Sequence, residues 1–124
     1  MYQFTPDNPF RSFNRYYVLI TPKTQRVYEI WGIGPAGKTE AGKKEQALVM
    51  ELLQEKYGIK EKEGMFDSLR DMRRIEQGNR YILVKLTGFL DTSIEIRYCD
   101  YDLGKIAEKE RLELEKKKVD GRGL

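Results

Sequence analysis

The residues most able to do chemistry lie at positions 32–39, which read GIGPAGKT. This segment fits the phosphate-binding pattern G-x-x-x-x-G-K-[ST] at every specified position. In such a loop the backbone N–H groups point at a phosphate, Lys38 reaches the outer phosphates and Thr39 ligates a magnesium ion. Trp31 precedes the loop, where a bound ligand could stack on its ring. The pattern therefore indicates a candidate ligand site that comprises Trp31, Gly34, Gly37, Lys38 and Thr39.

The context of this pattern favours a structural interpretation. A nucleotide-hydrolysing loop follows a central strand of a parallel sheet, and the next helix packs its first turns on that sheet. Here the preceding strand is the second arm of an expected hairpin, and residues 40–45 are mostly polar. We expect a strand-to-helix turn without bound nucleotide, with Thr39 as the helix N-cap. Two alternatives stay open: a nucleotide-dependent enzyme that uses Lys38 and Thr39, and a helix N-terminus that holds a small anion without hydrolysing it.

A second candidate anion-binding face comes from three arginines in an expected helix over residues 66–76. Arg70, Arg73 and Arg74 have the i, i+3, i+4 spacing of one helix face, and Arg80 follows nearby. Guanidinium groups bind phosphate and carboxylate well. Two aspartates within reach partly neutralise the row, so we interpret it as a solvated face. Weak nucleic-acid binding by this row is the third alternative.

Composition excludes several kinds of chemistry. The chain has no histidine, which removes histidine general acid–base catalysis, histidine-activated nucleophiles and nearly all zinc sites. One cysteine, Cys99, cannot form an internal disulfide or a multi-thiolate metal site. Lysine and arginine exceed the acidic residues by 23 − 20 = 3, which is too few to indicate nucleic acid as the partner. We expect no metal, no cofactor and no enzymatic activity.

The sequence indicates no membrane partner, since no apolar run approaches the roughly 18 to 20 residues of a membrane span. The lone cysteine suits a reducing compartment. Residues 1–14 have neither the basic start nor the apolar stretch of a signal peptide. We therefore expect a cytoplasmic protein, with an exported mature fragment as the alternative.

The hydrophobic pattern divides the chain into an irregular arm and one domain. Residues 1–14 combine prolines with phenylalanines and are expected to be irregular, while 15–124 form a single domain. Gly58 stands where a left-handed glycine would end a helix. Strands are expected at 16–20, 26–31, 80–87 and 93–99, and helices at 40–57, 66–76 and 104–118.

This order predicts an α+β fold with a four-stranded, mostly antiparallel sheet and helices mainly on one face. The order of a hairpin and then a helix occurs twice (ββα-α-ββα); whether this is a true duplication stays open. A single core is expected to contain Val18, Ile20, Leu48, Leu52, Leu83 and Ile96.

The sequence therefore favours a non-enzymatic binding or interaction module. Its ligand is expected to be a protein or a small anionic molecule, and a homo-oligomer stays open. A tryptophan, eight tyrosines and many arginines are the residue types that dominate binding interfaces.

Overall fold

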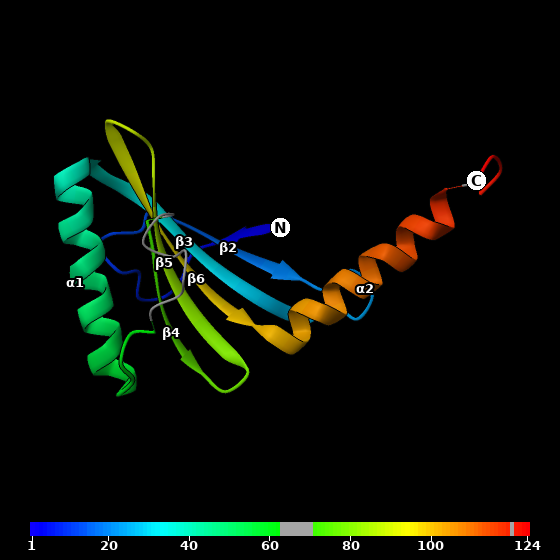
Figure 1. Ribbon diagram of the computed structural model, residues 1–124, viewed down its shortest axis with the longest axis horizontal. Helices are drawn as coiled ribbons and strands as arrows, with labels where there is room; N and C mark the ends of the chain where they lie inside the picture. Colours follow the sequence, from blue (N-terminus) through cyan, green and yellow to red (C-terminus); the bar gives the residue numbers. More distant parts are fainter. Residues whose placement is uncertain (63–70, 120) are drawn as a thin grey trace.

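The computed structural model describes residues 1–62, 71–119 and 121–124, and within them the chain forms one six-stranded antiparallel sheet and two helices (Figure 1). The spatial order of the strands is β1-β2-β3-β6-β5-β4. The elements are β1 (Tyr2–Phe4), β2 (Arg15–Ile20), β3 (Val27–Lys38), α1 (Thr39–Tyr57), β4 (Met72–Gln77), β5 (Arg80–Thr87), β6 (Asp91–Asp100) and α2 (Tyr101–Lys118).

The α+β class is confirmed, but the prediction of four strands is wrong because two further segments pair with the sheet. The arm contributes β1, in which Tyr2 pairs with Val18 and Phe4 with Tyr16. The helix expected over residues 66–76 is strand β4 over the part that the structure describes. Residues 63–70 lie outside the described residues. In β4 only Ile75 is fully buried, because side chains alternate between the two faces of a strand.

The glycine-rich segment is not a turn but the second half of β3. This strand pairs antiparallel with β2 on one side and with β6 on the other. Its one irregularity is a bulge between Pro35 and Gly37, where Gly37 adopts a φ of 79°. The strand runs directly into α1, whose N-cap is Lys38 without a side-chain hydrogen bond. The expected turn and the expected Thr39 cap are therefore both wrong.

The glycines of β3 are explained by the arm that crosses them. A Cβ on Gly34 would lie 1.9 Å from the carbonyl oxygen of Ser12. A Cβ on Gly32 would lie 3.0 to 3.2 Å from the side chains of Ile96, Phe13 and Tyr16. The Asn14 N–H donates to the Ile33 carbonyl at 2.9 Å, which fixes the arm at this level of β3. These glycines therefore make room for backbone and aromatic rings.

Helix α1 covers one face of the sheet, together with the arm. Its buried residues are Gly42, Gln46, Val49, Met50 and Leu53. They face a core formed by Ile75, Ile82, Val84, Leu86, Ile94 and Ile96 from the sheet and Phe13 from the arm.

The predicted core register of α1 is wrong, although its end at Gly58, with a φ of 66°, is confirmed. Leu52 is 41% exposed and Leu48 is only half-buried, as is Leu83 on the opposite sheet face. The buried stripe includes Gln46, whose amide donates to the carbonyls of Asp71 and Val84. Because the buried stripe contains a polar residue and a glycine, a hydrophobicity pattern does not identify it.

Helix α2 begins at the end of β6 and extends away from the sheet, on the side opposite α1 in Figure 1. The Asp100 carboxylate caps it by accepting the Leu103 N–H at 2.9 Å. Farther along, Glu110 is only 7% exposed and accepts three hydrogen bonds from Lys23 and Thr24 in the β2–β3 turn. The helix is therefore anchored to a turn, and the expected packing of the helices on one face holds for α1 alone.

Replacement of Gly34 by alanine is expected to destabilise the protein by at least about 2 kcal/mol, toward the upper end of the cost of overpacking. The reason is that the new methyl group would overlap the Ser12 backbone, which cannot rotate away. Gly104→Ala is the matched control, because nothing lies within 4 Å of a Cβ there. In the interior of α2, alanine should stabilise by up to about 1 kcal/mol. Denaturant titration measures both, and an unchanged midpoint for Gly34→Ala would show that the arm does not cross β3 here.

Candidate functional site

The structure places the residues of the phosphate-binding pattern in contacts within the chain. The Lys38 ammonium pairs with Asp91 at 2.9 Å, with both side chains largely exposed. The Thr39 hydroxyl donates to the Phe89 carbonyl at 2.9 Å, so it is not directed at an open ligand site. In this extended segment the backbone pairs with β2 and β6, so its N–H groups do not converge on one point as a phosphate-binding loop requires. Binding of an anion at the start of α1 stays a prediction.

The structure does not bring Trp31 together with Lys38. Lys38 follows Trp31 by seven positions along β3, which corresponds to about 23 Å at the rise of an extended chain. Gly34 and Gly37 lie between them, the first under the arm and the second in the bulge. The predicted composite site is therefore spread along one strand.

The arginine row is likewise divided, and Arg70 lies outside the described residues. Arg73 and Arg74 are neighbours on a strand and point to opposite faces. The Arg73 guanidinium binds the Glu61 carboxylate at 2.5 Å, and this hydrogen bond is the largest cause of its raised pKa. Arg74 lies 3.4 Å from Glu76, while Arg80 is mostly exposed and lies 3.9 Å from Asp100. These arginines do not form one anion-binding face.

The structure instead shows a row of side chains across the sheet face opposite α1. In the strand register Tyr17 pairs with Trp31, Trp31 with Arg97, Arg97 with Leu83 and Leu83 with Arg74. All five side chains are only half-buried. A second row beside it contains Arg15, Ile33, Glu95, Lys85 and Met72. We call these two rows the open face.

The centre of the open face is a stacked tryptophan and arginine. The Arg97 guanidinium carbon lies 4.0 Å from the centre of the Trp31 ring, a cation–π contact. The Arg97 Nε also donates to Glu95 at 2.8 Å, which fixes the orientation of the guanidinium plane. The Trp31 indole N–H is buried and has no hydrogen-bond partner among the residues that the structure describes. The pair thus presents a flat, preorganised surface.

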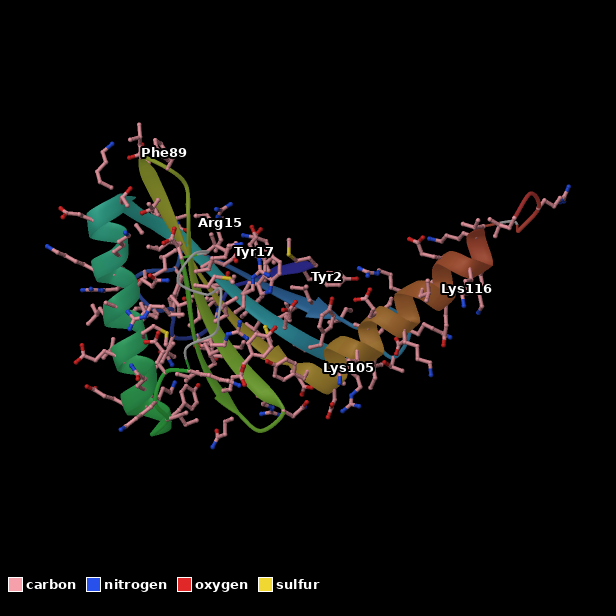
Figure 2. The ribbon with its side chains drawn as sticks, in the orientation of Figure 1. Tyr2, Arg15, Tyr17, Phe89, Lys105 and Lys116 are labelled. Atoms are coloured by element: carbon pink, nitrogen blue, oxygen red, sulfur yellow. The ribbon has the colours of Figure 1, made fainter. Side chains whose placement is uncertain are left out.

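Two cations flank this centre without forming ion pairs with described residues. Arg15 on β2 is exposed and Lys85 on β5 is half-buried. Both belong to the second row, on either side of Ile33 and Glu95. Figure 2 shows Arg15 and Tyr17 close together on β2. The open face therefore combines aromatic, aliphatic and charged groups of both signs.

Sequence reasoning included Trp31 among its candidate site residues, and that role stays a prediction; it did not include Tyr17, Arg97 and Lys85. The signal that was missed is the alternation of covered and solvated side chains along a strand. In β5 the buried residues at positions 82, 84 and 86 alternate with half-buried ones at positions 81, 83 and 85. Such a strand has one covered face and one partly solvated face. The sequence does not show which strands are neighbours, so it could not place Arg97 on Trp31.

One end of the open face is closed by the first turn of α2. The Tyr101 ring stacks on Tyr81 with centroids 4.6 Å apart, and its hydroxyl donates to Glu76 at 3.1 Å. Beneath them the Cys99 thiol donates to a Glu29 carboxylate oxygen at 3.0 Å. Burial, together with the hydrogen bond to Glu29, raises the pKa of the Cys99 thiol to about 12. The thiol is therefore held protonated and is a poor nucleophile.

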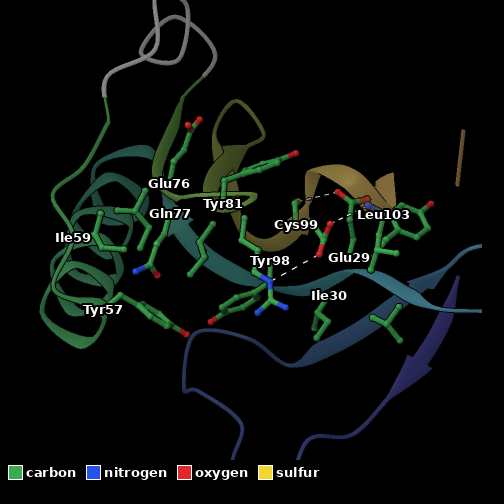
Figure 3. Close-up of a pocket in the computed structure, with 16 residues that line it drawn as sticks. Glu29, Ile30, Tyr57, Ile59, Glu76, Gln77, Tyr81, Tyr98, Cys99 and Leu103 are labelled. Carbon is green, nitrogen blue, oxygen red and sulfur yellow. Dashed lines mark hydrogen bonds and ion pairs between the residues drawn. The ribbon is translucent and has the colours of Figure 1, made fainter. Parts of the chain in front are cut away.

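A pocket lies on the other face of the sheet, below the end of α1 (Figure 3). Its volume is about 430 Å³. The apolar part of its lining includes Ile30, Ile59, Ile75, Ile82 and Leu103, and neutral polar groups come from Tyr57, Gln77 and Tyr98. Charged residues also line it, namely Glu29, Glu76, Arg80 and Asp100.

Within the described residues no group of three or more acidic, cysteine or histidine side chains is arranged to hold a metal ion. No described helix is long and apolar enough to cross a membrane. Comparison of the chain with protein families, curated proteins and solved structures found no match. The candidate sites are therefore identified by geometry alone, and they are the open face and the pocket.

Cys99 is expected to react with a disulfide reagent at pH 8 about a thousandfold more slowly in the folded protein than in the unfolded chain. A rise in pKa from the ordinary 9.0 to about 12 lowers the thiolate fraction by a factor of ten for each unit. The release of thionitrobenzoate measures the rate, with the protein in denaturant as the control. Equal rates in the two states would show that the thiol is neither buried nor bonded to Glu29.

Ionisation of the Cys99 thiol also makes the free energy of unfolding depend on pH in the alkaline range. Above about pH 9 the unfolded chain loses the Cys99 proton, whereas the folded chain keeps it up to about pH 12. Tyr98 acts in the same direction, because burial raises its pKa from 10.0 to about 12. The folded state then binds more protons, so the free energy of unfolding should fall as pH rises through this range. Denaturant midpoints measured against pH test this, and Tyr98→Phe should make the decline shallower; a flat profile would contradict it.

Proposed function

We propose that this protein is a non-enzymatic interaction module that binds another protein through its open face. The observation that carries the proposal is the register of Tyr17, Trp31, Arg97 and Leu83, which forms one half-buried row across four strands. Tryptophan, tyrosine and arginine are the residues that contribute most to protein interfaces. A row on paired strands is also held rigidly, so little conformational entropy is lost on binding.

The charges on the open face favour a protein over a polyanion. Glu95 lies in the second row between Ile33 and Lys85, pairs with Arg97 and is only 13% exposed at its side chain. A phosphate chain that reached Arg15 and Lys85 would pass this carboxylate, which would oppose binding. The aliphatic side chains of Ile33, Leu83 and Met72 also suit a protein surface, because an interface core is apolar with few charges.

The Trp31 indole supports a binding role on a second ground. A buried N–H group without a partner costs about 1 to 3 kcal/mol in a folded protein. A partner that shifts the Arg97 side chain and supplies a carbonyl or carboxylate oxygen would remove that cost. The cation–π interaction that such a shift would break is worth only about 0.5 to 2 kcal/mol.

The proposal is tested by affinity capture with charge-reversed variants. Lys85→Glu changes a cation on the open face that forms no ion pair with a described residue, and Lys105→Glu changes an exposed cation on α2 as the matched control. We expect at least one protein that wild type and the control capture equally and that the Lys85→Glu and Tyr17→Ala variants capture at least tenfold less. Purified candidates are then titrated against the emission of Trp31, the single tryptophan, with an expected tenfold rise in Kd for Lys85→Glu, about 1.4 kcal/mol.

Other results would overturn this assignment. Binding of labelled single-stranded DNA of about 20 nucleotides at about 150 mM salt, lost in Lys85→Glu, would identify a nucleic-acid binder. Steady hydrolysis of ATP or GTP that disappears in Lys38→Ala would favour the nucleotide-dependent alternative. Capture that is equal for all variants would exclude the open face.

A further inference from the structure

The pocket below α1 exists because α1 ends before the sheet does. The helix stops at Gly58, and the chain turns there so that Tyr57 and Ile59 form one wall. The strands continue beyond this point, where Ile30, Ile75 and Ile82 line the pocket; Ile30 is 37% exposed, while Ile75 and Ile82 are buried at the edge of the core. Leu103 from the first turn of α2 closes the far end.

Three polar side chains line this pocket without using their hydrogen-bonding capacity. The hydroxyls of Tyr57 and Tyr98 and the amide of Gln77 make no hydrogen bond with any described residue. Figure 3 shows the hydroxyl ends of Tyr57, from the end of α1, and Tyr98, from strand β6 of the sheet, turned toward each other. Burial raises the pKa of Tyr98 to about 12, so its hydroxyl stays neutral at physiological pH. Tyr57 and Gln77 are exposed and Tyr98 is half-buried, so all three polar groups are accessible to a ligand that enters the pocket.

The charged groups around the pocket neutralise one another. Arg80 lies 3.9 Å from Asp100, and Asp100 is also bound by Asn79 and by the Leu103 N–H. Glu76 is paired with Lys62 at 2.9 Å. Glu29 at the rim accepts a hydrogen bond from the Cys99 thiol and adds negative charge. A lining with paired charges and one further carboxylate does not match a phosphate or another anion.

We propose that this pocket binds an uncharged amphipathic small molecule. The apolar body of the ligand lies on Ile30, Ile75 and Ile82, and its polar end hydrogen-bonds with Tyr57, Gln77 and Tyr98. The volume of about 430 Å³ lies in the range of about 300 to 1,000 Å³ that is usual for small-molecule sites. The side chains that would hold the ligand lie on the opposite sheet face from Trp31, because Ile30 and Trp31 are adjacent on β3 and point to opposite sides of the sheet. The rim of the pocket reaches Glu29, Tyr81 and Cys99 at the end of the open face.

Nile red tests the proposal, because it is uncharged, apolar over most of its surface and carries a carbonyl acceptor. Its emission should rise in a saturable titration that fits one site per chain. Ile30→Lys places a charge in the pocket and should weaken binding at least tenfold. Leu112→Lys is the matched control on α2, where Leu112 is 55% exposed, and should leave the affinity unchanged. Tyr98→Phe removes only a hydroxyl and should weaken binding about three- to tenfold.

A second variant of the pocket distinguishes a loss of binding from a loss of folding. Gln77 is exposed at the end of β4, so Gln77→Phe should fold normally and fill the pocket, with the same tenfold loss. Circular dichroism melts identify any variant that is unfolded. The anionic dye anilinonaphthalene sulfonate should bind at least tenfold more weakly than Nile red. Absence of saturable binding, an equal loss in Leu112→Lys, or equal affinity for the anionic dye would overturn the proposal.

Discussion

The antiparallel pairing of β3 with β6 is the interaction on which the rest of the structure depends. The strand order places β1 and β2 on one side of this pair and β5 and β4 on the other, so no other strand pair joins the two halves. Nine residue pairs connect the two strands, from Glu29 with Cys99 to Lys38 with Asp91. The pairing positions Trp31 against Arg97 and also Ile30 against Tyr98. It therefore sets the geometry of the open face and of the pocket.

The parts of the fold that the sequence predicts correctly are those fixed by local chemistry. The β2–β3 hairpin, the glycine that ends α1 and the charged final helix each follow from turn residues or a periodic stretch. The parts it predicts wrongly depend on distant partners. Gly32 and Gly34 are typical of a turn by type, yet they lie in a strand because the arm crosses them. Likewise β4 forms because Ile75 and Arg73 meet Ile82 and Val84 on β5, a pairing that no local pattern shows.

The candidate sites show the same division. The sequence indicated Trp31 as a functional residue, but assigned it to a phosphate-binding loop rather than to a sheet face. Its actual neighbours, Tyr17 and Arg97, come from strands 14 and 66 residues away in the sequence, since 31 − 17 = 14 and 97 − 31 = 66. Strand alternation could have separated covered from solvated side chains. Only the register of the sheet brings the solvated ones together.

Alternation along the two central strands also keeps the two proposals independent. On β3 the Ile30 side chain lines the pocket and the Trp31 side chain lies on the open face. On β6 the Tyr98 side chain lines the pocket and the Arg97 side chain lies on the open face. A single substitution therefore changes one site and leaves the side chains of the other in place. The sites still share their backbone, and interiors this closely packed transmit small displacements. If a ligand in the pocket shifts β3 or β6, the stacking of Arg97 on Trp31 is the first contact on the opposite face that must adjust.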